Sequence, residues 1–174
     1  MERPDILKKH EILHRLSSLP AHLLSLHGNE NVSEFVLHEL CDAGCFNITK
    51  AAYVVDNPDF DCIKGIAGFA ATESYNAKRI WDDPASFSEH MRKSAFNTKV
   101  RDFIKPSMRR TAQSDENTSK IVAEFVGITK PAYCSWNMKH DNHGILIYET
   151  QISCPLDNEM LRNGACFLGF CPIN

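Results

Sequence analysis

The chain has 174 residues, a formal net charge of −3, and 43% hydrophobic against 24% charged residues, the composition of a folded globular domain. That composition excludes wholesale disorder and a coiled-coil rod, and a chain this long buries a core without disulfides. No apolar run reaches about 18 residues, so we expect no membrane span. The slightly acidic balance argues against nucleic acid as a partner.

The first residues, MERPDILKKHEILHRL, lack the basic start, apolar stretch and cleavage site of a secretory signal, so we expect a cytoplasmic protein. The cysteines are odd in number, and in a reducing compartment they are thiols or metal ligands rather than a disulfide framework. The seven are Cys41, Cys45, Cys62, Cys134, Cys154, Cys166 and Cys171.

The N-terminal quarter of the chain has helical spacing. Residues 4–18 predict a helix with Pro4 in its first turn, and residues 20–26 predict a second, short helix closed by Gly28. On the first helix one face is shared by Ile6, His10, Leu13 and Ser17.

A third helix is predicted over residues 32–42. Asn31 precedes it as an expected N-cap, with Glu34 three residues on, a pattern similar to a capping box. We expect the whole helical segment, residues 4–43, to pack on or beside a sheet.

Two runs rich in β-forming residues follow, at 45–55 and 62–69. The turn-forming cluster between them, which includes Asp56, predicts a β-hairpin whose aspartates bond the local backbone. Gly65 and Gly68 lie inside the second run, where glycine indicates a bulge or a close backbone approach rather than a nucleotide cradle.

The clearest helical pattern covers residues 83–104 and is ended by Pro106. Residues 107–117 are polar and predict a mobile loop. A further helix is expected from Asn117 or Thr118 to about Val126. The apolar stripe of the 83–104 helix consists of Phe87, Met91, Ala95, Phe96, Val100 and Phe103.

Residues 131–138 and 145–150 predict a second hairpin, and residues 151–174 are not assigned. The strands come in pairs and do not alternate singly with helices, which disfavours a doubly wound parallel sheet. We therefore expect one α+β domain over residues 1–174. Its antiparallel sheet is formed by two hairpins, at about 45–69 and 131–150, and is covered by helices.

His10, Glu11 and His14 form an H-E-x-x-H string in the first predicted helix. Two histidines four apart on a helix can bind one Zn²⁺, and the glutamate between them can deprotonate a metal-bound water. The string is similar to the zinc-peptidase motif at these three residues. His22 does not stand at the spacing of the third ligand in the extended motif. An amphipathic helix with histidines beside its stripe explains the string equally.

The late cysteines form a second candidate metal site. Thiolates from the second hairpin and a folded-back tail can make a tetrahedral zinc or iron–sulfur site, which Cys41 and Cys45 could join. No C-x-x-C pair is present, and thiols packed in a core are the alternative. The candidate ligands are Cys134, Glu149, Cys154, Cys166 and Cys171.

The end of the chain is similar to the tail of the 4-vinyl reductase domain, a small ligand-binding and sometimes metal-binding module. The similarity rests on Glu149, Cys154 and the string Gly164-Ala165-Cys166-Phe167. The cysteines here are spaced more widely than in that family. The likeness is confined to this short stretch and does not assign the chain to the family.

A basic strip lies between Arg92 and Arg110 in an otherwise acidic chain. Such a strip can meet a phosphate-bearing ligand, RNA or an acidic partner, or it can be a solvated helix face. Its members are Arg92, Lys93, Lys99, Arg101, Lys105, Arg109 and Arg110.

No assembled catalytic set is visible, so the favoured function is an intracellular small-ligand-binding or sensory module with an unidentified ligand. The first alternative is a zinc-dependent hydrolase with His10 and His14 as ligands and Glu11 as the general base. The second is a cysteine-ligated metal domain. An RNA-associated factor using the basic strip is the least favoured. If a cofactor is bound we expect zinc, and otherwise none. A homodimer is possible, and no membrane partner is expected.

Overall fold

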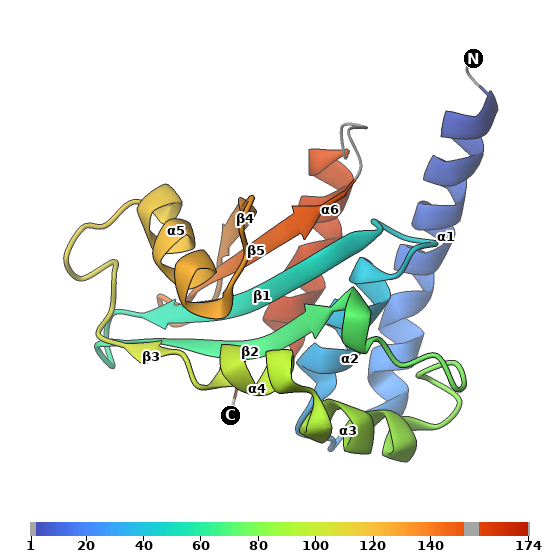
Figure 1. Ribbon diagram of the computed structural model, residues 1–174, viewed down its shortest axis with the longest axis horizontal. Coiled ribbons are helices and arrows are strands. Elements are labelled where there is room, and N and C mark those ends of the chain that lie inside the picture. Colours follow the sequence, from blue (N-terminus) through green and yellow to red (C-terminus); the bar gives the residue numbers. More distant parts are fainter. Residues whose placement is uncertain (1–2, 152–156, 174) are drawn as a thin grey trace.

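The computed structural model describes residues 3–151 and 157–173, and it confirms the α+β class (Figure 1). The five-stranded antiparallel sheet has the order β3-β2-β1-β5-β4. Both predicted hairpins are present, and β1 joins them by pairing with β5. The strands are β1 (Ile48–Asn57), β2 (Cys62–Ala70), β3 (Ile104–Lys105), β4 (Ala132–Asn137) and β5 (His143–Thr150).

Helices surround this sheet. The α-helices are α1 (Arg3–Ser25), α2 (Val32–Cys41), α3 (Pro84–Lys93), α4 (Ala95–Arg101), α5 (Asp115–Val126) and α6 (Asn158–Ala165). Two 3₁₀ turns are η1 (Ala71–Glu73) and η2 (Cys166–Phe170). In the part of the chain that the structure describes, no helix combines the length and the apolarity needed to cross a bilayer.

The sheet is buried on both faces at β1. Tyr53 points into a core shared with α1, α2 and α6, while Val54 points into a second core with α4 and α5. Leu146 and Ile147 of β5 divide between the two cores in the same way. Because successive side chains of a strand alternate between faces, two buried faces require the continuous apolar runs seen in these strands.

The helix boundaries differ from the predicted ones at several points. The helix predicted to run to Ile104 ends at Arg101, because Ile104 pairs with Lys64 as part of β3. α1 is one helix that continues through Pro20, because both halves bury the same face through Ile12 and Leu19. The predicted 83–104 helix is divided at Ser94, whose extended backbone starts α4 and whose hydroxyl accepts a hydrogen bond from the backbone N–H of Asn97.

Asn31 does occupy the predicted N-cap position of α2 but does not cap it with its side chain, and the predicted start of α5 is wrong. The Asn31 side chain does not accept a hydrogen bond from α2; its amide donates to the Glu34 carboxylate and to the Ser88 hydroxyl instead. α5 starts at Asp115, earlier than expected, because Ser114 accepts the backbone N–H of Asn117.

The outer face of α1 is the one that the sequence pattern singled out. Ile6, His10, Leu13 and Ser17 are all exposed there. The face packed on the rest of the protein is marked by Ile12, Leu19 and Leu26, which are buried.

Asp56 is not a turn residue of the first hairpin, as the sequence suggested. It lies near the end of β1, fully buried, and accepts hydrogen bonds from the Ser107 hydroxyl (2.5 Å) and from the backbone N–H groups of Met108 and Arg109 (both 3.0 Å). This buried carboxylate therefore holds the segment predicted to be a mobile loop, where Ser107 and Met108 are buried.

The glycines of β2 confirm the predicted close approach. The β1–β2 register shifts between Tyr53 and Val54, leaving an irregularity beside Gly65. A Cβ at Gly65 would lie 1.8 Å from the Val100 carbonyl oxygen, and one at Gly68 would lie 2.6 Å from a Val100 methyl group. The absence of a Cβ at these two glycines thus lets α4 pack directly on β2.

We expect Gly65→Ala to lower the free energy of unfolding by roughly 3 kcal/mol, because the new methyl group meets backbone that cannot move without shifting α4. Gly68→Ala meets the Val100 side chain at 2.6 Å and the α4 backbone, at Asn97, only at 3.2 Å, so a smaller shift of α4 relieves it and its cost should be lower, roughly 1–2 kcal/mol. Urea denaturation of both variants, with the exposed α4 variant Lys99→Ala as control, measures the difference. Equal midpoints for the two glycine variants would contradict this account of the contact.

Candidate functional site

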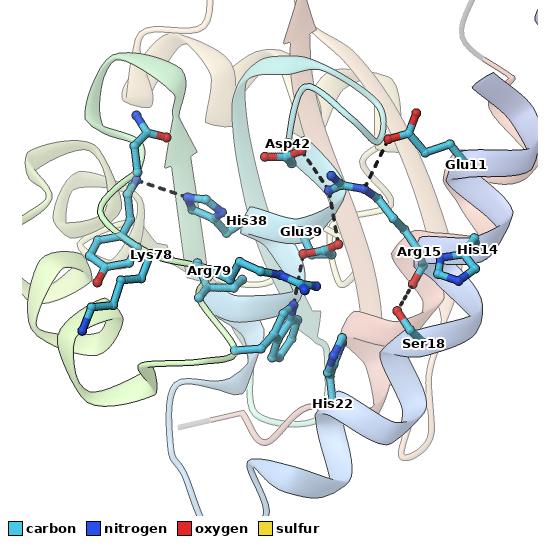
Figure 2. Close-up of a pocket in the computed structure, with 14 residues that line it drawn as sticks. Glu11, His14, Arg15, Ser18, His22, His38, Glu39, Asp42, Lys78 and Arg79 are labelled. Atoms are coloured by element: carbon cyan, nitrogen blue, oxygen red, sulfur yellow. Dashed lines mark hydrogen bonds and ion pairs between the residues drawn. The ribbon is translucent and has the colours of Figure 1, made fainter. Parts of the chain in front are cut away.

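A polar pocket of about 730 Å³ opens between α1, α2 and the segment from Tyr75 to Trp81 (Figure 2). Three histidines, His14, His22 and His38, contribute to its wall. It also contains equal numbers of acidic and basic side chains, Glu11, Glu39 and Asp42 against Arg15, Lys78 and Arg79.

Arg15 joins α1 to α2 on one wall of the pocket. Its guanidinium donates to Asp42 Oδ1 at 2.8 Å and to Glu39 Oε1 at 3.3 Å (Figure 2). Gly44 makes room for it, because a Cβ there would lie 2.5 Å from an Arg15 nitrogen. Asp42 also accepts the backbone N–H of Gly44 at 2.8 Å, which fixes the carboxylate that Arg15 reaches.

The opposite wall is tied to α2 by two hydrogen bonds. The backbone N–H of Tyr75 donates to His38 Nε2 at 3.3 Å, and the Trp81 indole N–H donates to Glu39 Oε2 at 3.1 Å. The Trp81 ring stacks on His22 of α1, with ring centroids 4.4 Å apart. Glu39 therefore contacts both walls, through Arg15 on one side and Trp81 on the other.

Burial lowers the pKa of His38 from its ordinary 6.5 to about 4, an effect that the nearby Asp42 partly opposes and His90 reinforces. A neutral imidazole is consistent with its role as acceptor for the Tyr75 N–H. His38 is thus a positioning group for the pocket wall at neutral pH rather than a cation.

Two polar groups of the pocket have no protein partner among the described residues. The Arg79 guanidinium forms no hydrogen bond or ion pair there, whereas Lys78 is paired with Asp83 at 3.2 Å. The ring nitrogen Nδ1 of His22 is buried and without a hydrogen bond. The Arg79 guanidinium is therefore available to a molecule that enters the pocket, whereas the His22 nitrogen is enclosed by protein.

The H-E-x-x-H residues are divided by the structure. Glu11 and His14 lie on the pocket wall, while His10 is exposed and is not among the pocket residues. Glu11 lies 4.0 Å from Arg15. Within the described ranges, no three His, Cys, Asp or Glu side chains are grouped so that they could hold a metal ion. The zinc hydrolase remains a prediction from the sequence.

The predicted cysteine cluster is only partly within the described residues, because Cys154 lies outside them. The Glu149 carboxylate accepts from the Thr129 hydroxyl and from the backbone N–H groups of Thr129 and Lys130, and these bonds lower its pKa although partial burial opposes them.

Three cysteines, Cys134, Cys166 and Cys171, all pack on the core that contains α1. Burial raises the pKa of Cys134 to about 12 and that of Cys171 to about 11, so these two are thiols at neutral pH.

The basic strip is largely paired with acidic side chains of the same chain. Arg92 and Lys93 both reach Glu89, Arg101 reaches the buried Glu34, and Arg110 reaches Asp61. This pairing favours the solvated-face interpretation over nucleic-acid binding.

His143 is a group that the sequence did not single out. Its Nε2 lies 2.9 Å from Asp115 Oδ2 and its Nδ1 lies 3.0 Å from Asn137 Oδ1. Ser135 donates to the same Asp115 carboxylate at 2.7 Å. Both ring nitrogens are occupied, so this buried cluster joins α5 to the second hairpin and leaves no free base for catalysis.

The pocket residues could have been found in part from helical spacing. One wall of the pocket is a polar stripe along α1, whose residues are separated by three or four positions. They are Glu11, Arg15, Ser18 and His22. The residues of the other wall, Arg79 and Trp81, have no such pattern. Comparisons with protein-family models, curated proteins and solved structures gave no match.

The low pKa of His38 makes a pH-dependent contribution to stability. The unfolded chain binds a proton at His38 below pH 6.5 and the folded chain only near pH 4, so stability falls as the pH falls through this window, by up to about 3 kcal/mol. In His38→Gln, whose side-chain carbonyl can still accept the Tyr75 N–H, this part of the pH dependence should disappear. Urea denaturation from pH 7 to pH 4 tests it; equal slopes in both proteins would contradict the assignment.

Proposed function

We propose that this protein is a small-ligand-binding module and that the pocket between α1, α2 and the 75–81 segment takes a small molecule with both a carboxylate and an ammonium group. The single observation that carries the proposal is the free Arg79 guanidinium, which has no partner among the described residues, in a pocket where the other cations are paired. A guanidinium binds a carboxylate through two parallel hydrogen bonds.

Glu11 supplies the opposite charge. Figure 2 places Glu11 on the α1 wall and Arg79 on the facing wall. The Glu11 side chain is largely exposed, and its nearest cation, Arg15, is already held at shorter distances by Asp42 and Glu39. A free guanidinium and an exposed carboxylate on facing walls fit a ligand such as an amino acid.

The stacked rings of His22 and Trp81 add a flat, partly apolar surface to the same pocket. A pocket with a few placed polar groups around an aromatic surface is the usual form of a small-molecule site.

The test is a thermal-shift screen with the twenty amino acids, followed by titration calorimetry of those that raise the melting temperature. Simple carboxylates and simple amines serve as half-ligands and should bind more weakly than the amino acid. Arg79→Ala and Glu11→Gln should each weaken binding about tenfold or more, since a charge-assisted hydrogen bond contributes about 1.5–3 kcal/mol.

Lys99→Ala removes an exposed cation from α4, away from the pocket, and is the matched control, with unchanged affinity. The proposal fails if no amino acid stabilises the protein. It also fails if one binds Arg79→Ala as tightly as the unaltered chain.

A further inference from the structure

The exposed apolar side chains of the protein are concentrated on α1. Five of the large hydrophobic residues that the structure describes as exposed are on α1 or beside its C-terminal end, each between 56% and 82% accessible. They are Ile6, Leu7, Leu13 and Leu24 on the helix and Phe170 in η2. Burying such side chains is the usual source of free energy for association.

Three of these residues, Ile6, Leu13 and Leu24, belong to a regular stripe. Counting along α1, the exposed positions of the outer face are separated by four, three, four, three and four residues, the spacing of the contact positions in a coiled coil. The stripe consists of Ile6, His10, Leu13, Ser17, Pro20 and Leu24. It faces away from the pocket residues Arg15 and His22.

The two ends of α1 differ in shape. The first turns, residues 5–11, are exposed throughout, and Figure 1 shows this end of the helix extending beyond the rest of the protein. The other end borders an apolar groove of about 490 Å³, lined among others by Leu23, Leu24, Phe167 and Phe170. One end is thus a projection with exposed aliphatic groups, and the other is a recess with apolar walls.

The ends also differ in charge. Residues 16–26 contain no Asp, Glu, Lys or Arg, whereas the first half of α1 contains Asp5, Lys8, Lys9 and Glu11. Parallel pairing through the stripe would place the two projecting, charged halves beside each other and the two grooves beside each other. Antiparallel pairing sets the charged half of one helix against the uncharged half of the other, with Lys9 near the partly negative C-terminal end of the second helix.

We propose that α1 is the interface of a homodimer in which two copies of this helix pack antiparallel. In the register centred on residue 15, Ile6 lies on the partner's Leu24 at the rim of the groove, and Leu13 lies on the partner's Ser17. Leu7 lies beside the partner's Ala21. The interface is isologous, because each copy supplies both the projecting end and the recess.

The available surface is sufficient for such a dimer. The five exposed residues, doubled by symmetry, supply ten large apolar side chains. At on the order of 100 Å² each they bury roughly 1,000 Å², and the remaining contacts along a helix of about 35 Å bring the total to the range of specific interfaces.

Sedimentation-velocity ultracentrifugation of the full chain over a concentration series tests the oligomeric state. The unaltered protein should sediment as a dimer, and Leu13→Glu and Leu24→Glu should each shift it to monomer. Phe60→Glu, which places the same charge at an equally exposed apolar residue of the first hairpin, is the matched control and should leave the dimer intact. Circular dichroism establishes that each variant is folded.

Cross-linking separates the antiparallel register from other arrangements and does not require a destabilising variant. Ile6→Cys combined with Leu24→Cys should give a covalent dimer on mild oxidation, above the background of the native cysteines. Ile6→Cys alone should not. A monomer at all concentrations, a dimer that survives both glutamate variants, or efficient cross-linking by Ile6→Cys alone would overturn the proposal. So would a monomer that instead co-sediments with anionic phosphatidylserine vesicles.

Discussion

The position of α1 depends on Arg15. The guanidinium is half-buried between α1 and α2, reaches two carboxylates of α2 and its C-terminal end, and lies against the backbone at Gly44. A partly buried network of this kind contributes more than an isolated exposed ion pair, whose contribution is about 0.2–1 kcal/mol. Together with the buried Ile12 and Leu19 it fixes the rotation of the helix about its axis. That rotation turns Glu11, His14 and His22 toward the pocket and the stripe from Ile6 to Leu24 toward solvent.

Much of the architecture could be predicted because strand pairing within each hairpin is local. Both hairpins have continuous β-forming runs and short connections, and the glycines of β2 indicated that another segment of backbone lies close against that strand. The helix limits were predicted less well, because Pro20 continues a helix against its local preference and Ser94 caps a new helix where the apolar stripe runs on without a break. Burial of Ile12 and Leu19 on one surface keeps α1 continuous, while the Glu73 carboxylate, which accepts from the Ser94 hydroxyl and the Phe96 N–H, stabilises the break before α4.

The site was harder to predict because its two walls are distant in sequence. Arg79 and Trp81 lie in a segment without periodicity, and their relation to Glu39 exists only in the folded chain. The H-E-x-x-H string identified Glu11 and His14 correctly as neighbours on a helix, but the rotation of α1 leaves His10 on its outer side. Asp56 shows the same limit, because its partners are about fifty residues away in the chain.

Hydrogen–deuterium exchange of the amides in α1 tests the central claim most directly, that Arg15 holds this helix in place. In the unaltered chain the amides of residues 12–23 should be protected, and in Arg15→Met they should exchange faster while those of β1 and β5 keep their protection. Arg92→Met, which removes an exposed ion pair on α3, should change nothing in α1. Equal exchange of α1 in the unaltered and Arg15→Met proteins would contradict the account.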